Sequence, residues 1–498
     1  MVNCHPKFAK QSMDAAPTMS PISMGSRLCF KPLCLCILTA LTVAGCAMGP
    51  DYERPELTLP SQYQAQILSQ TSAEQGSSLK EVSALSWRHF YQDPVLILLI
   101  EHALSSNLDL QMAQSRLLAA RSKMTVVDSA LWPEISASAG FERSLDSGTT
   151  SKDPSPGTTL DLAGTVSWEL DLWGANRRAS EAAKADYLSE VEKLRLTYVS
   201  LISDIASRYY EWLDIEQRYS VSIDTVGIRQ KELDIAKLRH ANGVISGLDV
   251  RQAEVELQST KVTLPTLDYE RKYKINQLHI LLGEYDYALP SPQGLPENVG
   301  LPYELSAGVP SELLTLRPDV KMSEQAMIAA NAQVGIAKAA FFPKFTISGQ
   351  YGRENNHLKD IFDSNGVTWS LLGGISAPIF NRGKIAAEYD IATEEAKQSM
   401  LSYRNVVLTA YFDVNDALNN LKRAQEAIKA QRELVQSSSA YARLARLRYQ
   451  NGVATSLDLM DAQRQLFSAQ LAYSEILRDK QLAKIALYRA LGGGAVSE

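Results

Sequence analysis

Few residues in this sequence have the types and spacing that catalysis or metal binding requires. The six histidines are scattered along the chain, and no two of them have the spacing of metal ligands. The LGGGA stretch near the C-terminus is followed by no lysine and helix, so it is not a phosphate-binding loop. The sequence therefore predicts a protein that is not an enzyme and holds no metal ion. The histidines are His5, His89, His102, His240, His279 and His357.

The cysteines indicate targeting rather than redox chemistry. All five lie at the N-terminus, so the body of the chain has no disulfide framework and no thiolate metal site. Arg27 and Lys31 precede the apolar run PLCLCILTALTVAGC, which has the length of a signal-peptide core and is too short to span a bilayer as a helix. We expect a signal peptide at 1–45, with Met24 as a more typical start than Met1. The cysteines are Cys4, Cys29, Cys34, Cys36 and Cys46.

The end of this apolar run resembles a bacterial lipobox. Val43, Ala44 and Gly45 precede Cys46, whose thiol would carry a diacylglycerol after cleavage. A plain signal peptide that happens to contain cysteine is the alternative. Residue 47 is alanine rather than aspartate, which resembles lipoproteins sorted to the outer membrane. We therefore expect a lipid-anchored segment at 46–86 and no cofactor beyond the lipid.

The charge balance gives no reason to expect a nucleic acid partner. Loss of residues 1–45 would lower the formal net charge from −6 to −9, because that segment carries four basic residues and one acidic residue. An acidic chain lacks the basic surface that phosphate backbones require.

Acidic residues recur at a turn that the chain makes twice. LRHANGVISGLDV at 238–250 and LRYQNGVATSLDL at 447–459 are separated by 209 residues. Asn-Gly after a basic helical end predicts a helix stop, since glycine adopts the left-handed conformation without strain. Ser246 or Thr455 can cap the next helix, with Asp249 or Asp458 in its first turn. Each copy therefore predicts the tip of a helical hairpin.

This turn is one landmark of a repeat that covers most of the chain. SALWPEISASAGFE at 129–142 matches AAFFPKFTISGQYG at 339–352, DLWGANR at 171–177 matches PIFNRGK at 378–384, and LLG at 281–283 matches ALG at 490–492. Near-constant spacing predicts two structural repeats, at 87–290 and 311–495, joined by a Pro- and Gly-rich linker at 291–310.

The periodicity of apolar residues changes within each repeat. Apolar residues at steps of three and four, without proline, predict long helices at 174–241 and 382–450, each on the order of 100 Å in length. A second helix, at 246–283 or 455–491, runs back along each of them to complete a hairpin. Alternation of apolar and polar residues predicts strands at about 133–143, 159–173, 343–352 and 366–380. Such strands fit a membrane barrel with a wet interior, or half-buried strands of a soluble sandwich. Four strands cannot close a barrel, so a membrane barrel would need several chains.

Four segments carry a resemblance to a known family. They are GCAMGPDYERP (45–55), WRHFYQDPVLILLIEHAL (87–104), LLTLRPDVKMSEQAMIAANAQVGIAKAAFFP (313–343) and YQNGVATSLDLMDAQ (449–463). With the repeat, they resemble the TolC-like outer-membrane efflux factors, in the lipoprotein (NodT/RND-type) branch that serves tripartite drug pumps. The resemblance implies an α+β membrane protein of the Gram-negative outer membrane, a homotrimer with a twelve-stranded β-barrel and a periplasmic α-helical tunnel.

The resemblance also implies roles for residues at the tips. Leu457, Asp458 and Asp461 match the family's aperture, where an acidic ring over a leucine ring would favour cations. Tyr449 and Asp249 match a pair that holds the tip shut, and Arg448 offers an alternative charge because Ala454 replaces the family's arginine. The simpler reading of these acids is that they are charges at helix N-termini. Contact with a periplasmic adaptor is implied for Asn242, Gly243, Val244, Ser246, Asn451, Gly452, Val453 and Thr455, which also form simple turns.

The function that follows is an exit duct of a tripartite efflux pump. It would passively conduct drugs or other small molecules from an adaptor (membrane fusion) protein and an inner-membrane RND or MFS-type transporter to the outside. The alternatives are a type I secretion duct for polypeptides and a periplasmic adaptor lipoprotein. A metal-ion exporter is less favoured, because the chain lacks methionine clusters.

Overall fold

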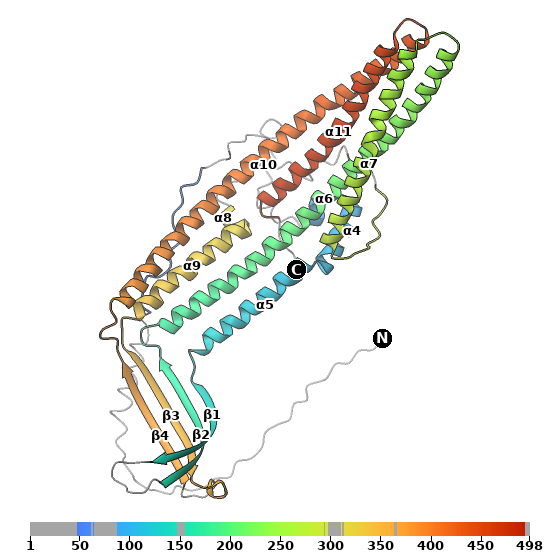
Figure 1. Ribbon diagram of the computed structural model, residues 1–498. Helices are drawn as coiled ribbons and strands as arrows, with labels where there is room; N and C mark the ends of the chain where they lie inside the picture. The colour runs from blue at the N-terminus through green and yellow to red at the C-terminus, as the bar shows by residue number, and fades with distance from the viewer. Residues whose placement is uncertain are drawn as a thin grey trace, which may run out of the picture. The chain divides into compact units, whose positions relative to one another are not determined.

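The computed structural model describes residues 47–60, 63, 87–146, 155–292, 294–296, 310, 313–362 and 366–493, which belong to one compact unit (Figure 1). The expected signal peptide and Cys46 lie outside the described residues. So do most of the expected anchored segment 46–86 and most of the linker 291–310.

The two repeats contain similar elements in a similar order. The first has α3 (Trp87–Phe90), α4 (Pro94–Ser106), α5 (Leu108–Ser129), β1 (Glu134–Asp146), β2 (Ser155–Leu170), α6 (Ala175–Ala241) and α7 (Gly247–Leu282). The second has α8 (Leu313–Leu316), α9 (Pro318–Ala339), β3 (Lys344–Asn355), the short 3₁₀ helix η2 (Leu358–Asp360), β4 (Val367–Ser376), α10 (Lys384–Gln450) and α11 (Ser456–Ala490).

The hairpin helices begin and end within two residues of their expected bounds. The strands differ more from theirs. Strand β2 ends at Leu170 rather than 173, because the Asp171 carboxylate accepts hydrogen bonds from the backbone N–H groups of the first turn of α6. Strand β4 ends at Ser376 rather than 380, before Pro378, which has no N–H to donate. At the ends that lie away from the helices, β1, β2 and β3 are longer than expected. Backbone pairing between these strands continues there, although the alternation of apolar and polar residues has stopped.

Helices α4, α5 and α9 are absent from the expectations above. Local signals for them are nevertheless present in the sequence. The Asp93 carboxylate accepts hydrogen bonds from Val95 N and Leu96 N at the start of α4, and Asn107 accepts one from Leu110 N at the start of α5. Pro318 occupies the first turn of α9, where its missing N–H is not needed.

The four strands form one antiparallel sheet in the order β1-β2-β3-β4. The central pair, β2 and β3, comes from different repeats and aligns Trp168 with Ile347 and Val166 with Gly349. The sheet therefore joins the repeats, and it leaves β1 and β4 as its edges (Figure 1).

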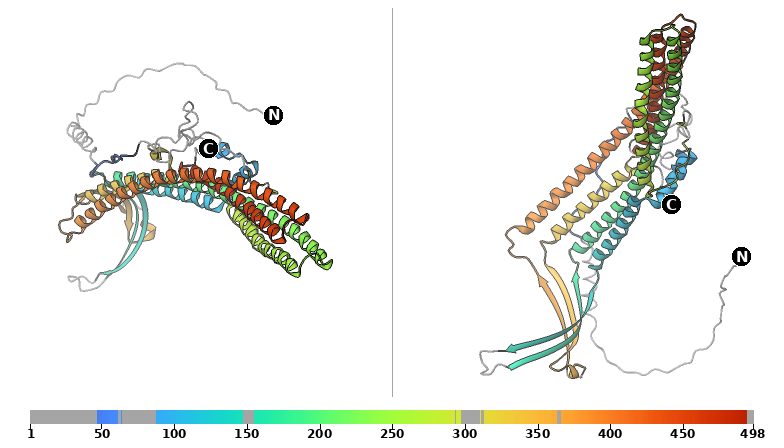
Figure 2. Two further views of the ribbon diagram at one scale, coloured as in Figure 1. Left: turned by 90° about the horizontal axis from the view of Figure 1, so that it is seen from above. Right: turned by 45° about the vertical axis from the view of Figure 1, so that its right-hand side comes forward.

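Helix α6 lies between helices of its own repeat and helices of the other repeat. Near the strands it packs against α5 and α9, and farther along it packs against α7 and α11 (Figures 1 and 2). Helix α10 likewise packs first against α9 and then against α11. In the described part of the chain, no helix combines the length and the apolar character needed to cross a membrane.

The largest cores lie at about the middle of the two long helices. Leu96, Leu99 and Ile100 of α4 are fully buried against Ile202 and Ile205 of α6, in the first core. The second is built around Tyr403, Val407 and Leu421 of α10, with residues of α9 and α11. Burial therefore concentrates where helices of both repeats meet, and not at the strands or the tips.

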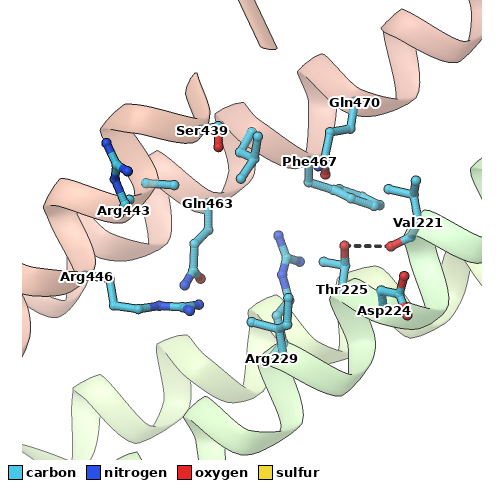
Figure 3. A pocket seen from close by; sticks show the side chains of 13 residues that line it. Val221, Asp224, Thr225, Arg229, Ser439, Arg443, Arg446, Gln463, Phe467 and Gln470 are labelled. Atoms are coloured by element: carbon cyan, nitrogen blue, oxygen red, sulfur yellow. Dashed lines mark hydrogen bonds between the residues drawn. The ribbon is translucent and has the colours of Figure 1, made fainter. Parts of the chain in front are cut away.

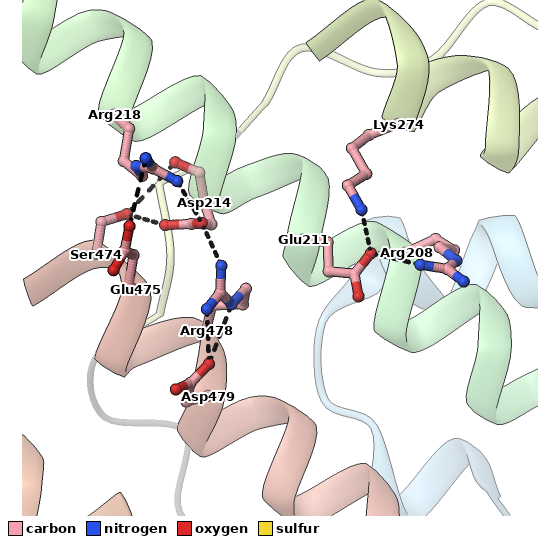
Figure 4. A network of polar contacts seen from close by, with 9 residues as sticks. All are labelled: Arg208, Glu211, Asp214, Arg218, Lys274, Ser474, Glu475, Arg478 and Asp479. Atoms are coloured by element: carbon pink, nitrogen blue, oxygen red, sulfur yellow. Dashed lines mark hydrogen bonds and ion pairs between the residues drawn. The ribbon is translucent and has the colours of Figure 1, made fainter. Parts of the chain in front are cut away.

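A buried polar network joins α6 to α11 beside the first core (Figure 4). Asp214 is fully buried, and its carboxylate accepts hydrogen bonds from Ser474 Oγ at 2.6 Å and Arg478 Nη1 at 3.0 Å. Burial raises the pKa of Asp214, while the bond from Ser474 and the charges of Arg478 and Arg218 oppose that rise. Such a network fixes the two helices in one register, because any slip would leave a buried carboxylate without partners.

The N-terminal residues that are described lie along the helices near the strands. Arg178 of α6 donates to the Met48 carbonyl at 3.2 Å and pairs with Asp51 at 2.7 Å. Arg54 forms a two-pronged ion pair with the nearly buried Glu324 of α9, at 2.6 and 2.5 Å. This segment therefore contacts both repeats.

Arg317 closes the end of the second hairpin. It is 7% exposed, donates to the Ala490 carbonyl at 3.0 Å, and bonds Asp319 at 2.6 and 3.0 Å and Asp413 at 2.9 Å. One guanidinium group thus joins the start of α9, the middle of α10 and the end of α11. A lysine has no planar fork with which to make these bonds together.

We predict that Arg317→Lys destabilises the protein by about 2 kcal/mol, because the buried Ala490 carbonyl and one carboxylate lose their donor. Circular dichroism at 222 nm should show a thermal midpoint lower by about 3 °C. Arg423→Lys is the matched control, because Arg423 is exposed on α10 and donates to Asn420. Equal midpoints for the two variants would show that Arg317 has no such role.

Candidate functional site at the hairpin tips

The two hairpin tips lie side by side at the end of the helices opposite to the strands (Figure 1). In each tip the helix stops at an asparagine, whose side chain donates to the helical carbonyl four residues earlier: Asn242 to Leu238 at 2.7 Å and Asn451 to Leu447 at 2.8 Å. Gly243 and Gly452 follow with φ of 72° and 73°, the left-handed conformation that glycine tolerates. The repeated Asn-Gly therefore produces the same turn twice.

Each returning helix begins with a capping box. Ser246 and Thr455 accept hydrogen bonds from the backbone N–H groups of Asp249 and Asp458, whose carboxylates accept from the Ser246 and Thr455 N–H groups in return. The bond from the Thr455 backbone, then that from its hydroxyl, lowers the pKa of Asp458, and the charge of Arg448 lowers it further. Both tips are thus rigid at their turns without help from other parts of the chain.

Of the three aperture candidates, Leu457 and Asp458 are exposed and Asp461 is half-exposed. Leu457 is 56% exposed, and Asp458 lies one residue further along α11. Asp461 lies on the next turn, where it accepts hydrogen bonds from Arg464 at 3.3 Å and Gln465 at 2.8 Å. Because Arg448 and Arg464 lie close to these carboxylates, the negative charge of this group is partly compensated.

The expected Tyr449 to Asp249 link is not formed within this chain. The Asp249 carboxylate accepts a hydrogen bond from Ser456 instead, and the Tyr449 ring lies under the Arg239 guanidinium, 4.9 Å from ring centroid to Cζ. The structure does bring Tyr449 and Asp249 to the wall of one cavity of about 490 Å³ between the hairpins. Arg448 lies near Asp458 of its own hairpin rather than near Asp249.

Ser456 is a functional candidate that sequence reasoning missed. It is 8% exposed and its hydroxyl bridges from the first residue of α11 to Asp249 of the first hairpin. The bond from Ser456 is the largest influence on Asp249, whose pKa it lowers. A signal for it existed, since Gly247 occupies the corresponding position of the first repeat and has no side chain to donate.

A second contact between the hairpins was also missed. Glu232 of α6 pairs with Arg446 of α10 at 3.1 Å and accepts a hydrogen bond from Gln463 of α11. Glu232 is thus a single acceptor for two helices of the other hairpin. We call the contacts of Ser456 with Asp249 and of Glu232 with Arg446 and Gln463 the hairpin latch.

The candidates for adaptor contact lie at the outermost turns. All eight are exposed, and Val244 and Val453 are 61% and 67% exposed although they are apolar. An exposed valine beside an asparagine and a glycine at each tip gives two similar surfaces. Within the described residues, no three histidine, cysteine or carboxylate side chains gather as metal ligands.

Comparison with known proteins identifies the family. The model of the family described as outer membrane efflux protein matches residues 99–284 and 309–493, so that one match falls on each repeat. These two segments comprise most of the chain.

Individual relatives agree with this assignment. The toluene efflux pump outer membrane protein TtgC of Pseudomonas putida is 31% identical over 93% of this chain and 96% of its own. The cation efflux system protein CusC of Escherichia coli is 30% identical over 93% of this chain and 99% of its own. The open state of the MtrE outer membrane channel of Neisseria gonorrhoeae superposes with a TM-score of 0.81 at 29% identity, over 90% of this chain and 98% of that one. The chain, with its two repeats, two hairpins and single four-stranded sheet, therefore belongs to the outer membrane efflux protein family.

Proposed function

We infer that the protein is an efflux channel component of the Gram-negative outer membrane and that it extends into the periplasm. We propose that three copies form one duct, which receives small molecules from a periplasmic adaptor and an inner-membrane transporter of the RND or MFS type. The duct conducts them passively, without catalysis. Its gate is formed by the hairpin tips. The observation that carries this proposal is the exposed Leu457 and the half-exposed Asp461 beside the hairpin latch.

The sheet supports the trimer. Within the described residues β1 and β4 each pair on one side only, and a sheet edge inside a membrane needs a partner strand. Trp369 and Leu371 of β4 are 75% and 74% exposed, so the strand offers apolar side chains to lipid or to a neighbouring copy. Three such sheets joined edge to edge would give twelve strands in a closed barrel.

The cargo class is part of the proposal, because the relatives are named for different cargo. TtgC is named for toluene and CusC for cations. The chain lacks the methionine clusters that a metal route would favour, so we propose drugs or other organic small molecules. A polypeptide duct and an adaptor lipoprotein have less support, because the relatives compared above are outer-membrane efflux components or channels.

Lipidation of Cys46 is also proposed. Ala47, the next residue, lies against Gly174 at the junction of β2 and α6, where a Cβ on Gly174 would be 2.7 Å from the Ala47 Cα. A lipid on the preceding residue would thus enter the membrane beside the strands. This position is compatible with an anchor in the leaflet that faces the periplasm.

The proposed gate is tested by single-channel conductance of the purified, lipidated protein in planar bilayers. We expect a low-conductance pore that widens several-fold in Leu457→Ala, because the substitution removes an exposed apolar side chain from the constriction. Leu434→Ala is the matched control, since Leu434 is 51% exposed on α10 but lies far from the tip. Absence of any pore from a verified trimer would overturn the exit-duct function.

We further predict that the double variant Asp458→Asn with Asp461→Asn raises the leak conductance and weakens cation selectivity. Asparagine retains an oxygen that can accept the Thr455 N–H bond of the capping box, so the variant removes charge without uncapping α11. The reversal potential in a KCl gradient measures the selectivity. An unchanged reversal potential would count against the acidic aperture.

The hairpin latch should make the closed state sensitive to acid. The folded-state pKa of Asp249 lies below its usual value of 3.8, so the contribution of its carboxylate is present above that value and is lost as pH falls through the folded pKa. We predict constant conductance from about pH 5 to 8 and a rise below about pH 4. Ser456→Ala should conduct more at neutral pH and show a smaller acid-induced rise, since it has already lost the bond to Asp249. Identical pH profiles of wild type and variant would exclude this latch.

A further inference from the structure

A second cavity, of about 340 Å³, lies between the hairpins and farther from the tips than the one described above. Its walls come from α6, α10 and α11, and it shares Ile228 and Arg446 with the cavity at the tip. Figure 3 shows that Arg229, Arg446 and Gln463 point toward one another from these three helices. The cavity thus brings two guanidinium groups and an amide to one place.

Arg229 is an unusual wall residue because it is charged and only 5% exposed. It donates to the Glu256 carbonyl at 2.6 Å and pairs with the Glu256 carboxylate at 3.2 Å, both on α7. Burial lowers the pKa of Arg229, with Arg464 adding to that effect. These contacts hold its head in place from behind, so that the cation is fixed beside the cavity before any ligand arrives.

The remaining walls are apolar on one side and acidic at one end. The Phe467 ring lies against the Arg229 guanidinium, 5.6 Å from ring centroid to Cζ, and is part of the cavity lining. Arg443 adds a third cation to the lining, and no ion pair or hydrogen bond of its side chain is present in the described structure. Asp224, the acidic residue of the lining, lies away from Arg446 and Gln463 in Figure 3.

From this arrangement we propose that the cavity binds an aromatic carboxylate. Its anionic head accepts hydrogen bonds from Arg446 and Gln463 near Arg229, and its ring packs on Phe467. Two charge-assisted bonds and one aromatic contact are enough to orient a ligand that fits this volume. Asp224 excludes a second negative charge at the far end, so a monoanion is preferred to a dianion.

Occupancy would affect the hairpin latch. Arg446 and Gln463 are also the donors to Glu232, so a bound carboxylate competes with Glu232 for both of them. The ligand would then join α6, α10 and α11 through its own head. This ligand site is a property beyond the exit-duct function. Ligand binding is measured without conduction, so the two proposals can fail independently.

The proposal is tested by isothermal titration of the purified full-length protein in detergent with 2-naphthoate. The neutral 2-naphthamide and the cationic 2-naphthylmethylammonium have the same ring and control for partition into detergent. We expect saturable binding of one naphthoate per chain, about tenfold weaker binding of the amide, and none of the cation. Equal binding of all three compounds, or no saturable binding, would overturn the proposal.

Three variants separate recognition of the anion from a structural effect. Arg446→Gln should weaken naphthoate binding about tenfold, whereas Glu232→Gln, which breaks the same ion pair, should tighten it because it frees the guanidinium. Arg423→Gln is the matched control, since Arg423 is an exposed arginine on α10 outside the cavity lining. If Glu232→Gln and Arg423→Gln weaken binding as much as Arg446→Gln, the effect is structural and the proposed site is wrong.

Discussion

The contact of α6 with α9 and α11 is the constraint on which the rest of the structure depends, because it is where the helices of the first repeat meet those of the second. Fully buried Asp214 makes this contact specific, since its carboxylate is satisfied only when Ser474 and Arg478 lie opposite it. A hydrophobic interface alone would tolerate small slips along two such long helices. The buried carboxylate does not, and it thereby sets the relative height of the two hairpin tips.

The tips combine local rigidity with few contacts between hairpins. Each turn is fixed by its own Asn-Gly stop and capping box, which involve no residue of the other hairpin. The hairpins are joined there by polar contacts, of which the pair of Arg446 with Glu232 is partly solvent-accessible, with side chains 48% and 23% exposed. Partly exposed polar contacts of this kind contribute about 1 kcal/mol each, so hairpins can separate without unfolding their turns. This division suits a gate, because the parts that move stay folded.

Much of the fold could be predicted from the sequence, because its signals are local. The Asn-Gly turns, the long proline-free helices and the alternating strands are each encoded within short windows, and the repeat places them twice. The ends of the strands could not be predicted as well. The end of β2 depends on Asp171 bonding backbone groups of the next helix, and the extension of β1 depends on a partner strand rather than on alternation.

The residues of the candidate site also divide into those that the sequence predicts and those that only the folded chain brings together. The sequence by itself determined that the tips exist, that Ser246 and Thr455 cap the returning helices with Asp249 and Asp458 in their first turns, and that Leu457 and Asp461 lie in the first turns of α11. Only the tertiary structure decided that Ser456 bonds Asp249 and that Glu232 meets Arg446 and Gln463, because these partners lie 207 or more residues apart along the chain. The physical reason is that capping is a property of one turn of helix. A contact between hairpins instead depends on the register that α6 and α11 adopt when their buried polar groups are satisfied.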